Sequence, residues 1–184
     1  MMGKNHVLAG AGVAGAAWGF TRLAVGKSPF LGELVRPYAG FLKNFLFPDG
    51  LAGPVLAGLG GAYIAMYVLG TLGPDMDNPR SILGRRFHVP VEHRTILHSL
   101  WPVIAFLCVS ALRTWLRPMA AFAAGWTAHL ICDSFSMEGV RFFWPFRTRR
   151  HIFRLYTTGE TSEAVCTAVF ICLGITGAVL GFLA

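Results

Sequence analysis

Two acids and two histidines stand between long apolar runs, and this contrast constrains the chain more than any other feature. The polar stretch extends from Gly73 to Ser99 and reads GPDMDNPRSILGRRFHVPVEHRTILHS. Ionisable side chains are costly to place near a hydrocarbon phase, so they are kept there mainly where they bind something or pair with one another. The stretch therefore indicates a functional site at the ends of neighbouring spans rather than a solvated loop.

The composition is that of a membrane protein. Of the 184 residues, 54% are hydrophobic and 14% are charged, whereas an average soluble domain is about 25% charged. The length fits a single domain over residues 1–184. The formal net charge of +7 is explained by topogenic and lipid-facing arginine, and we expect no nucleic-acid partner.

Five apolar runs predict an all-α, polytopic membrane bundle of about five spans. A helix needs about 20 residues, rising 1.5 Å each, to cross the hydrocarbon core. The predicted spans are residues 7–25, 51–72, 96–116, 119–135 and 164–184. The first run lacks a convincing cleavage boundary, so we expect no cleaved signal peptide. Its many small residues predict close packing against another helix.

The segment from Lys27 to Gly50 has a different pattern. Its apolar residues recur at spacings of three and four, with charges elsewhere, which predicts an amphipathic helix. A helix lying in the membrane interface and a helix packed on the core fit this pattern equally well.

Nearly all the unusual polar residues fall on one side of the predicted bundle. If the five spans alternate in direction, the same face receives His6, Asp75, Asp77, His93, His98, His129, Asp133 and Glu163. Most of the 16 Lys and Arg residues also lie on this face, and the positive-inside rule then places it in the cytoplasm. The sequence therefore predicts one site at the cytoplasmic side of the membrane.

The spacing of these residues favours metal binding. Asp75 and Asp77 can hold a divalent cation together, or they can form an Asx-type turn after the Gly-Pro break. His129 and Asp133 share one helix face, which suits two ligands, a ligand with its orienting carboxylate, or a packed hydrogen-bonded pair. Histidine and carboxylate together suit zinc or manganese. The chain has no HExxH motif, which excludes that class of zinc protease.

The residues next to this cluster leave several roles open. Thr95 is a candidate N-cap for the third span, which would place His98 in the first helical turn. Arg94 can bind a phosphate or lie among lipid headgroups. Ser99 has no nucleophile motif around it, so a helix-surface hydroxyl is the better interpretation.

The order of these blocks resembles a known family. GKNH, GPDMDNPRS, HRTILHS, GWTAHLICDSFSMEGVRFFWPF and TTGETSE follow one another along the chain. The sequence resembles the YdjM-like family of inner-membrane metal-dependent hydrolases of the LexA-regulated type. That family is distantly similar to zinc-dependent phospholipase C and the fungal zinc nucleases. Gly73 stands where the family more often has leucine, and residues 28–50 have no counterpart.

The resemblance implies a helical fold with a cluster of two or three divalent metal ions, zinc or manganese, and phosphoester hydrolysis. The metal ligands that it implies are His6, Asp75, Asp77, His98, His129, Asp133 and Glu163. Asp75, His93 and Arg94 are the candidate catalytic residues.

A site at headgroup depth predicts a substrate that is a phospholipid or a lipid-linked phosphate, with membrane lipids as partners. The alternative is a non-enzymatic metal-binding membrane protein, either a scaffold or a divalent-cation carrier. A carrier should place its ionisable groups near the midplane, whereas here they stand at the span ends. A lipid phosphatase of the phosphatidic-acid type requires Ser-Arg about five residues before the histidine, where this chain has Ala123 and Ala124. We therefore set this class aside.

Overall fold

The computed structural model describes residues 3–28, 30, 33, 53–113, 116–150 and 153–183. The described helices are α1 (Gly3–Lys27), α3 (Gly53–Leu72), α4 (Leu100–Leu112), α5 (Pro118–Ser134) and α6 (Thr161–Leu183). Two short 3₁₀ helices, η1 (Pro74–Asp77) and η2 (Ile96–His98), lie between α3 and α4. Within these ranges the only strand-like pairing is an isolated bridge between Ser136 and Tyr156. The all-α prediction is confirmed for this part of the chain.

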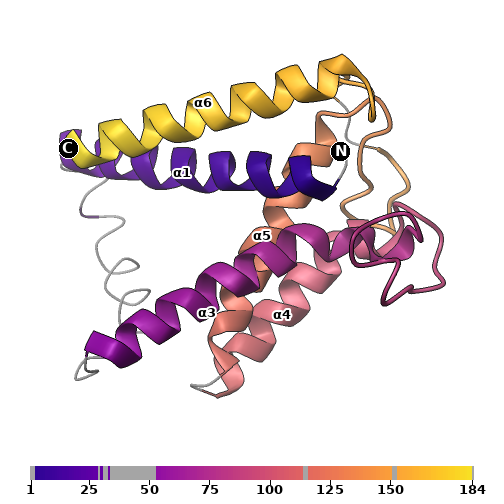
Figure 1. Cartoon of the computed structure of the whole chain (residues 1–184), viewed down its shortest axis with the longest axis horizontal. Helices are drawn as coiled ribbons and strands as arrows, with labels where there is room; N and C mark the ends of the chain where they lie inside the picture. The colour runs from indigo at the N-terminus through magenta and orange to yellow at the C-terminus, as the bar shows by residue number, and fades with distance from the viewer. Residues whose placement is uncertain are drawn as a thin grey trace.

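The helices form two groups that share one end. Helices α1 and α6 lie side by side, and α3, α4 and α5 form the second group (Figure 1). The start of α1, the end of α3, the starts of α4 and α6 and the end of α5 all lie at the same end of the molecule (Figure 1). We call this the polar end, because the loops that carry the acids and histidines gather there.

Glycine allows the helices of each group to approach closely. In α1, a Cβ at Gly12 would collide with the carbonyl oxygen of Phe170 in α6. In α5, a Cβ at Gly125 would collide with the carbonyl oxygen of Tyr67 in α3. Backbones at this separation pack through van der Waals contact, as small residues permit in membrane helices. The close packing predicted for the first apolar run is therefore present.

Aromatic side chains hold the helices and the η2 turn in their relative positions. One hydrophobic cluster joins α4, α5 and the segment after α5; it contains Val103, Ala123, Trp126, Leu130 and Val140. Trp126 Nε1 donates to the Leu97 carbonyl at 2.8 Å, which holds η2 against α5. The Tyr67 hydroxyl donates to the Gly10 carbonyl at 2.6 Å and so ties α3 to α1. These contacts set the relative positions of the elements that carry the site.

Two described helices, α1 with 25 residues and α6 with 23, are long and apolar enough to cross a membrane. The stretches 60–72 and 100–112 are apolar but shorter. The predicted five-span bundle is therefore not confirmed. The largest difference lies in the predicted span 96–116, where η2 precedes α4 and α4 begins only at Leu100.

The start of α4 also corrects the predicted cap. Ser99 is the N-cap, and its Oγ accepts a hydrogen bond from Trp101 N at 3.4 Å. Thr95 instead precedes η2, so His98 lies in a 3₁₀ turn outside α4. The amphipathic helix predicted over residues 27–50 lies almost entirely outside the described residues.

Candidate metal centre

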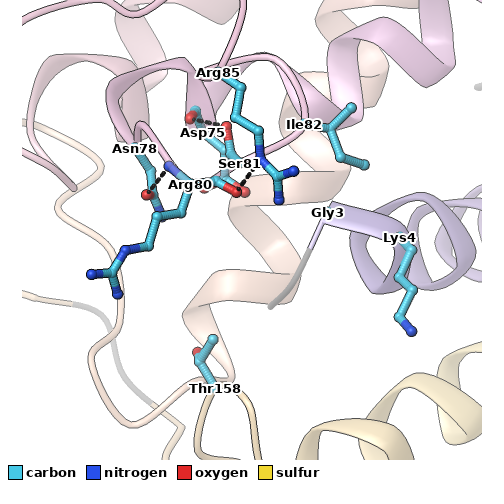
Figure 2. Close-up of a pocket in the computed structure, with 9 residues that line it drawn as sticks. All are labelled: Gly3, Lys4, Asp75, Asn78, Arg80, Ser81, Ile82, Arg85 and Thr158. Atoms are coloured by element: carbon cyan, nitrogen blue, oxygen red, sulfur yellow. Dashed lines mark hydrogen bonds between the residues drawn. The ribbon is translucent and has the colours of Figure 1, made fainter.

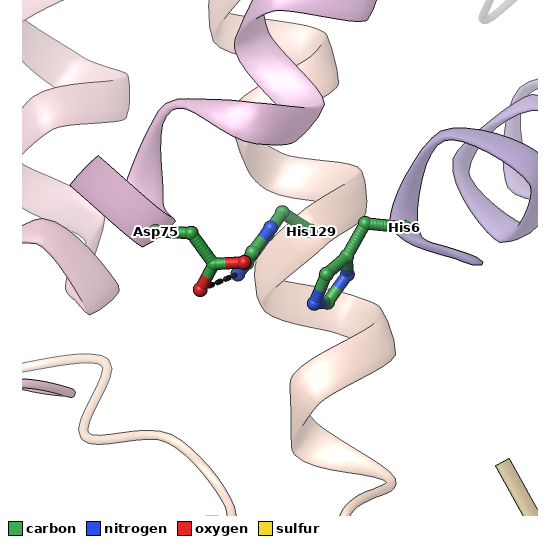
Figure 3. Close-up of side chains that lie close together, drawn as sticks. All are labelled: His6, Asp75 and His129. Carbon is green, nitrogen blue, oxygen red and sulfur yellow. Dashed lines mark ion pairs between the residues drawn. The ribbon is translucent and has the colours of Figure 1, made fainter. Parts of the chain in front are cut away.

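Five buried side chains from four elements meet at the polar end, and we call them the inner cluster. Its members are His6 from α1, Asp75 from η1, His98 from η2, and His129 and Asp133 from α5. The three histidines have no exposed surface, and Asp133 and Asp75 are 1% and 7% exposed. Figure 3 shows His6, Asp75 and His129 converging from their three elements. Alternation of the helices thus brings together residues that are far apart in sequence.

The local structure explains how each element presents its side chain. His129 and Asp133 are one helical turn apart on α5 and face the same side. The rings of His6 and His129 stack with centroids 3.7 Å apart, and their tilt is 17°. Both Nε2 atoms then face Asp133, at 3.4 Å for His6 and 3.5 Å for His129.

The distances inside the inner cluster are those of ligands around a shared cation. Nε2 of His98 lies 3.6 Å from Asp133 Oδ2 and 3.8 Å from Asp75 Oδ1. Nε2 of His129 lies 3.8 Å from the same Asp75 oxygen. Two ligands that each lie about 2.1 Å from a tetrahedral metal are about 3.4 Å apart. Direct hydrogen bonds would be shorter, at about 2.7–3.2 Å.

The buried histidine nitrogens support the same conclusion. Nε2 of His6, His98 and His129 is buried without a hydrogen-bond partner among the described residues. A buried polar atom left in this way is rare and costly. A metal ion removes the cost, because each neutral imidazole would donate its lone pair to the ion. The residues present therefore fit a divalent metal.

A hydrogen bond to the Thr71 backbone fixes the tautomer of the neutral His129 ring. Its Nδ1 lies 2.7 Å from the carbonyl oxygen of Thr71, which can only accept a hydrogen bond. Nδ1 must therefore carry the proton, which leaves the Nε2 lone pair directed at Asp75 and Asp133. Second-shell contacts of this kind orient metal-binding histidines in many proteins.

Three overlapping groups of residues could each hold a metal ion. They are His6 with Asp75 and His129; Asp75 with His93 and His98; and His98 with His129 and Asp133. Within each group the ligand atoms lie within 4.8 Å of one another. Because Asp75, His98 and His129 each belong to two groups, neighbouring ions would share them.

Asp77 and His93 lie beside the inner cluster and form what we call the outer pair. His93 Nδ1 and Asp77 Oδ1 are 2.7 Å apart, a short hydrogen bond. The other Asp77 oxygen lies 3.3 Å from His98 Nδ1 and accepts from the Arg94 backbone N–H at 3.3 Å. Asp77 belongs to none of the three groups among the described residues. Its contacts place it where it orients His98.

The carboxyl groups of η1 are held ionised. Burial alone would raise the pKa of Asp75, but His129, His98 and His6 outweigh it and hold that pKa below its usual range. Burial likewise raises the pKa of Asp77, but the contacts with His93 and His98 outweigh burial and lower that pKa. Ionised carboxylates and neutral imidazoles are the forms that bind a metal.

The pKa of His98, in contrast, is raised. Burial lowers its pKa, but the neighbouring carboxylates of Asp75, Asp77 and Asp133 outweigh burial and raise the pKa to about 9. Without a metal, therefore, His98 carries a proton at neutral pH. A metal that binds there must displace this proton.

Arg94 is surrounded by protein acceptors. Its Nη1 donates to Ser136 Oγ at 2.9 Å and to the Gly139 carbonyl at 2.8 Å. Nη2 lies 3.5 Å from Asp133 Oδ2, and Nε lies 3.0 Å from Glu138 Oε2. The side chain is 10% exposed, and the backbone φ is 61°. Arg94 thus contacts Asp133 through its guanidinium group, and its largely buried side chain presents little surface to a substrate.

Glu163 also lies next to the inner cluster rather than within it. Its carboxylate accepts from Asn5 Nδ2 and from the Gly159 N–H, each at 2.6 Å. None of the three metal-binding groups found among the described residues contains it. Asn5 precedes His6, so Glu163 fixes the first turn of α1, which carries that histidine.

Ser99, the serine of the predicted HRTILHS block, has a structural place. Its Oγ donates to the Ile96 carbonyl at 2.7 Å and caps α4, and the residue has no exposed surface. The prediction of a helix-surface hydroxyl is therefore wrong, because Ser99 is buried at the N-cap and its hydroxyl is used inside the protein.

Sequence reasoning missed three supporting residues. They are Asn5, Thr71 and Ser136, which contact Glu163, His129 and Arg94 respectively. Asn5 stood inside the quoted GKNH block and Ser136 inside DSFSMEG, so their position next to predicted ligands was a usable signal. Thr71 contributes a backbone carbonyl, which no side-chain pattern reveals.

A pocket of about 390 Å³ opens beside Asp75. It is lined by the start of α1 and by the loop after η1, including Lys4, Arg80 and Arg85 (Figure 2). Asp75 is the one member of the inner cluster that lines it. The cluster is therefore buried on most sides but borders an open space at Asp75.

Known proteins share this sequence pattern. The chain is 31% identical over 122 residues to the inner membrane protein YdjM of Escherichia coli K12, and equally to that of Shigella flexneri. In both cases the alignment covers 56% of this chain and 61% of the relative. It is 29% identical over 123 residues to the uncharacterized protein YvsG of Bacillus subtilis 168, covering 62% of this chain and 73% of YvsG. No solved structure matches the chain at a significant level.

The family assignment rests on the whole length. A sequence model of the YdjM inner membrane protein family matches residues 1–183, which include every member of the inner cluster. Together with two helices long enough to cross a membrane, this match identifies a membrane protein. The chain belongs to the YdjM inner membrane protein family.

Proposed function

We propose that this protein is a membrane-embedded, metal-dependent hydrolase that cleaves a phosphoester of a lipid or lipid-linked substrate. The observation that carries the proposal is the set of three buried histidine Nε2 atoms that have no hydrogen-bond partner among the described residues and that face Asp75 and Asp133. Two or three divalent ions, zinc or manganese, would be held by His6, Asp75, His98, His129 and Asp133. Such ions polarise a phosphoryl oxygen and lower the pKa of a bound water.

Asp75 has the position expected of a residue that meets the substrate. It belongs to two of the three metal-binding groups and also lines the pocket. Its carboxylate would orient a water molecule bound to the metal and accept a proton from it, because the metal lowers the pKa of that water. Asp75 is therefore our first candidate for the general base.

His93 is the candidate proton donor. Its side chain is 39% exposed, whereas the other histidines near it are buried. Asp77 accepts from Nδ1 when this nitrogen carries the proton, and this contact orients the ring. A histidine that is held by a carboxylate and open to solvent can supply a proton to a leaving group. Arg94 holds Asp133 and is, on this proposal, a positioning residue.

The location of the site suggests the substrate. The polar end gathers the loops between helices that enter a membrane, so the site lies near headgroup depth on this proposal. The excess of Lys and Arg on the same side supports a cytoplasmic orientation of a multi-pass chain. A phosphate within a lipid headgroup is at the matching depth.

A structural metal site is the second candidate, because the three histidines of the inner cluster have no exposed surface. Complete burial is typical of metals that stabilise a fold, since catalytic metals keep an open position. The pocket beside Asp75 favours catalysis, because it leaves one side of the cluster accessible. A carrier role has less support, since the polar groups gather at helix ends.

Turnover separates these candidates. We would assay the detergent-purified protein with phosphomonoester and phosphodiester substrates, before and after metal removal and after return of zinc or manganese. The proposal predicts activity that is lost with the metal, restored by its return and absent in Asp75→Asn. Activity that survives complete metal removal would rule out the metal-dependent mechanism, and bound metal without turnover would support the structural role.

A further inference from the structure

The pocket beside Asp75 is lined by three cationic side chains. Lys4 stands in the first turn of α1, and Arg80 and Arg85 stand in the loop that follows η1. In Figure 2 Arg85 lies beside Ser81, Arg80 extends to the lower left and Lys4 extends downward at the right, and Thr158 lines the pocket below them. Its volume of about 390 Å³ is typical of small-molecule sites, which span about 300–1,000 Å³.

None of the three cations is neutralised within the described part of the chain. Neither Lys4, Arg80 nor Arg85 forms an ion pair with a carboxylate of any described residue. Asp75 is the only acidic residue that lines the pocket, and its carboxylate faces His98 and His129. The pocket therefore has an excess of positive charge that the acidic groups of the described residues do not balance.

The loop that carries the two arginines is held in place by its own hydrogen bonds. Ser81 Oγ donates to the Asp75 carbonyl at 2.7 Å and accepts from the Gly84 N–H at 2.8 Å. Arg85 Nε donates to the Arg80 carbonyl at 3.2 Å, which fixes the position of its guanidinium. The loop is thus attached to the backbone of a candidate metal ligand, and the Arg85 guanidinium is positioned before any ligand binds.

The start of α1 adds to the positive potential. Gly3 and Lys4 both line the pocket, and they are the first residues of a helix of 25 residues. The first N–H groups of a helix have no partner within it, and the helix dipole is positive at this end. Together with the three cations, this end of α1 favours an anion in the pocket.

We propose that the pocket of Lys4, Arg80 and Arg85 binds a phosphate-type anion of the substrate directly beside the metal-binding cluster. Guanidinium groups recognise phosphate oxygens through paired hydrogen bonds, and a lysine adds a point charge. An anion held there lies against Asp75, on the accessible side of the inner cluster. This inference rests on the proposed hydrolase function and names the chemical group that brings the substrate to it.

A binding experiment on metal-stripped protein tests the pocket by itself. Inorganic phosphate and pyrophosphate would be titrated into the detergent-solubilised protein and followed by calorimetry. The double variant Arg80→Ala with Arg85→Ala should bind at least about tenfold more weakly than wild type, since each lost charge-assisted contact weakens binding severalfold. Equal affinity in wild type and double variant would overturn the proposal.

Arg86→Ala is the matched control. Arg86 is exposed and lies in the same loop, but it does not line the pocket. Its loss removes the same charge from the same surface, so the proposal predicts unchanged phosphate affinity. A loss as large as that of the double variant would show general attraction to a basic surface and would overturn the pocket.

A second arm distinguishes a lipid headgroup from a soluble phosphate. The protein would be placed in nanodiscs of phosphatidylcholine alone or with phosphatidic acid, and the pyrophosphate titration would be repeated. Competition by phosphatidic acid that disappears in the double variant assigns the anion to a lipid headgroup. Pyrophosphate binding that depends on the two arginines but is indifferent to phosphatidic acid assigns it to a soluble phosphate. Both results support the pocket.

Metal uptake, measured after zinc or manganese is returned to the same preparations, separates this inference from the proposed function. Arginine-dependent phosphate binding by a protein that takes up no metal would leave the pocket standing and refute the hydrolase. A metal-loaded protein whose phosphate affinity ignores both arginines would refute the pocket and leave the hydrolase standing.

Discussion

The inner cluster and the outer pair are adjacent, but they differ in exposure and in how their polar atoms are paired. Asp77 Oδ1 and His93 Nδ1 form a hydrogen bond of 2.7 Å, and the His93 side chain is 39% exposed. The histidines of the inner cluster are fully buried, and their Nε2 atoms lie 3.4–3.8 Å from carboxylate oxygens without a hydrogen bond. The polar atoms of the outer pair are hydrogen-bonded to each other, whereas the Nε2 atoms of the inner cluster have no hydrogen-bond partner among the described residues. On the proposed function, the inner cluster holds the metal and Asp77 orients its ligands.

Loss of an inner ligand should have the largest effect on metal affinity. In His98→Ala, the ion loses a ligand that belongs to two of the three metal-binding groups. We expect affinity to fall by more than about 100-fold, beyond the range seen for second-shell residues. Competition with a chromophoric chelator measures this loss. His88→Ala, in an exposed histidine of the preceding loop, should leave the affinity unchanged.

A smaller loss should follow from Asp77→Asn. The amide keeps the size of the side chain but removes the charge that orients His98 and His93. Residues in this position typically contribute about 10–100-fold to metal affinity. The same chelator competition applies. An affinity equal to that of wild type would mean that Asp77 does not act on the metal through His98.

The pH dependence of metal binding should reflect His98. Its pKa is raised to about 9 without metal, so a proton occupies the ring below that pH and must leave when a metal binds. Affinity should therefore rise up to about tenfold per pH unit between pH 7 and pH 9, then level off. Asp77→Asn removes one cause of the raised pKa, so the levelling should move to lower pH. A flat profile in wild type would contradict this account.

The same shift affects the stability of the metal-free protein. Because the pKa of His98 is higher in the folded state than the unfolded value of about 6.5, its proton stabilises the fold below that pH. This contribution is lost as the pH rises through about 9. Thermal unfolding of the metal-stripped protein should therefore show a midpoint that decreases from pH 7 to pH 9.5. Metal-loaded protein should lack this decrease, because the metal has already replaced the proton.

The smallest effect should follow from His93→Ala. The ring is partly exposed, and it belongs to one metal-binding group only. We expect less than about a tenfold change in metal affinity, below the range for a residue that orients a buried ligand. If His93 is the proton donor, turnover should fall far more than metal affinity. A metal affinity as low as that of His98→Ala would remove the distinction between the two regions.

Periodicity was sufficient to predict much of this architecture. The apolar runs predicted the helical fold, and the alternation of spans predicted that His6, Asp75 and His129 would share one end. Spacing of four on one helix placed His129 beside Asp133. These features follow from regular local geometry, which a sequence displays directly.

Irregular geometry accounts for what could not be predicted. Because a 3₁₀ turn precedes α4, the N-cap of this helix is Ser99 and not Thr95 as predicted. Apolar periodicity does not reveal such a short element. The contacts of Glu163 with Asn5 and Gly159 depend on how α1 and α6 meet in space. The structure places Glu163 beside the cluster, and its predicted role as a ligand stays a prediction.

Metal content tests the central claim most directly. Elemental analysis would compare purified wild type with the double variant His129→Ala, Asp133→Ala, with circular dichroism to confirm that both are folded. The account predicts about two or three zinc or manganese ions per wild-type chain, and loss of most of them in the double variant. Folded wild type without metal, or equal metal in both proteins, would contradict it.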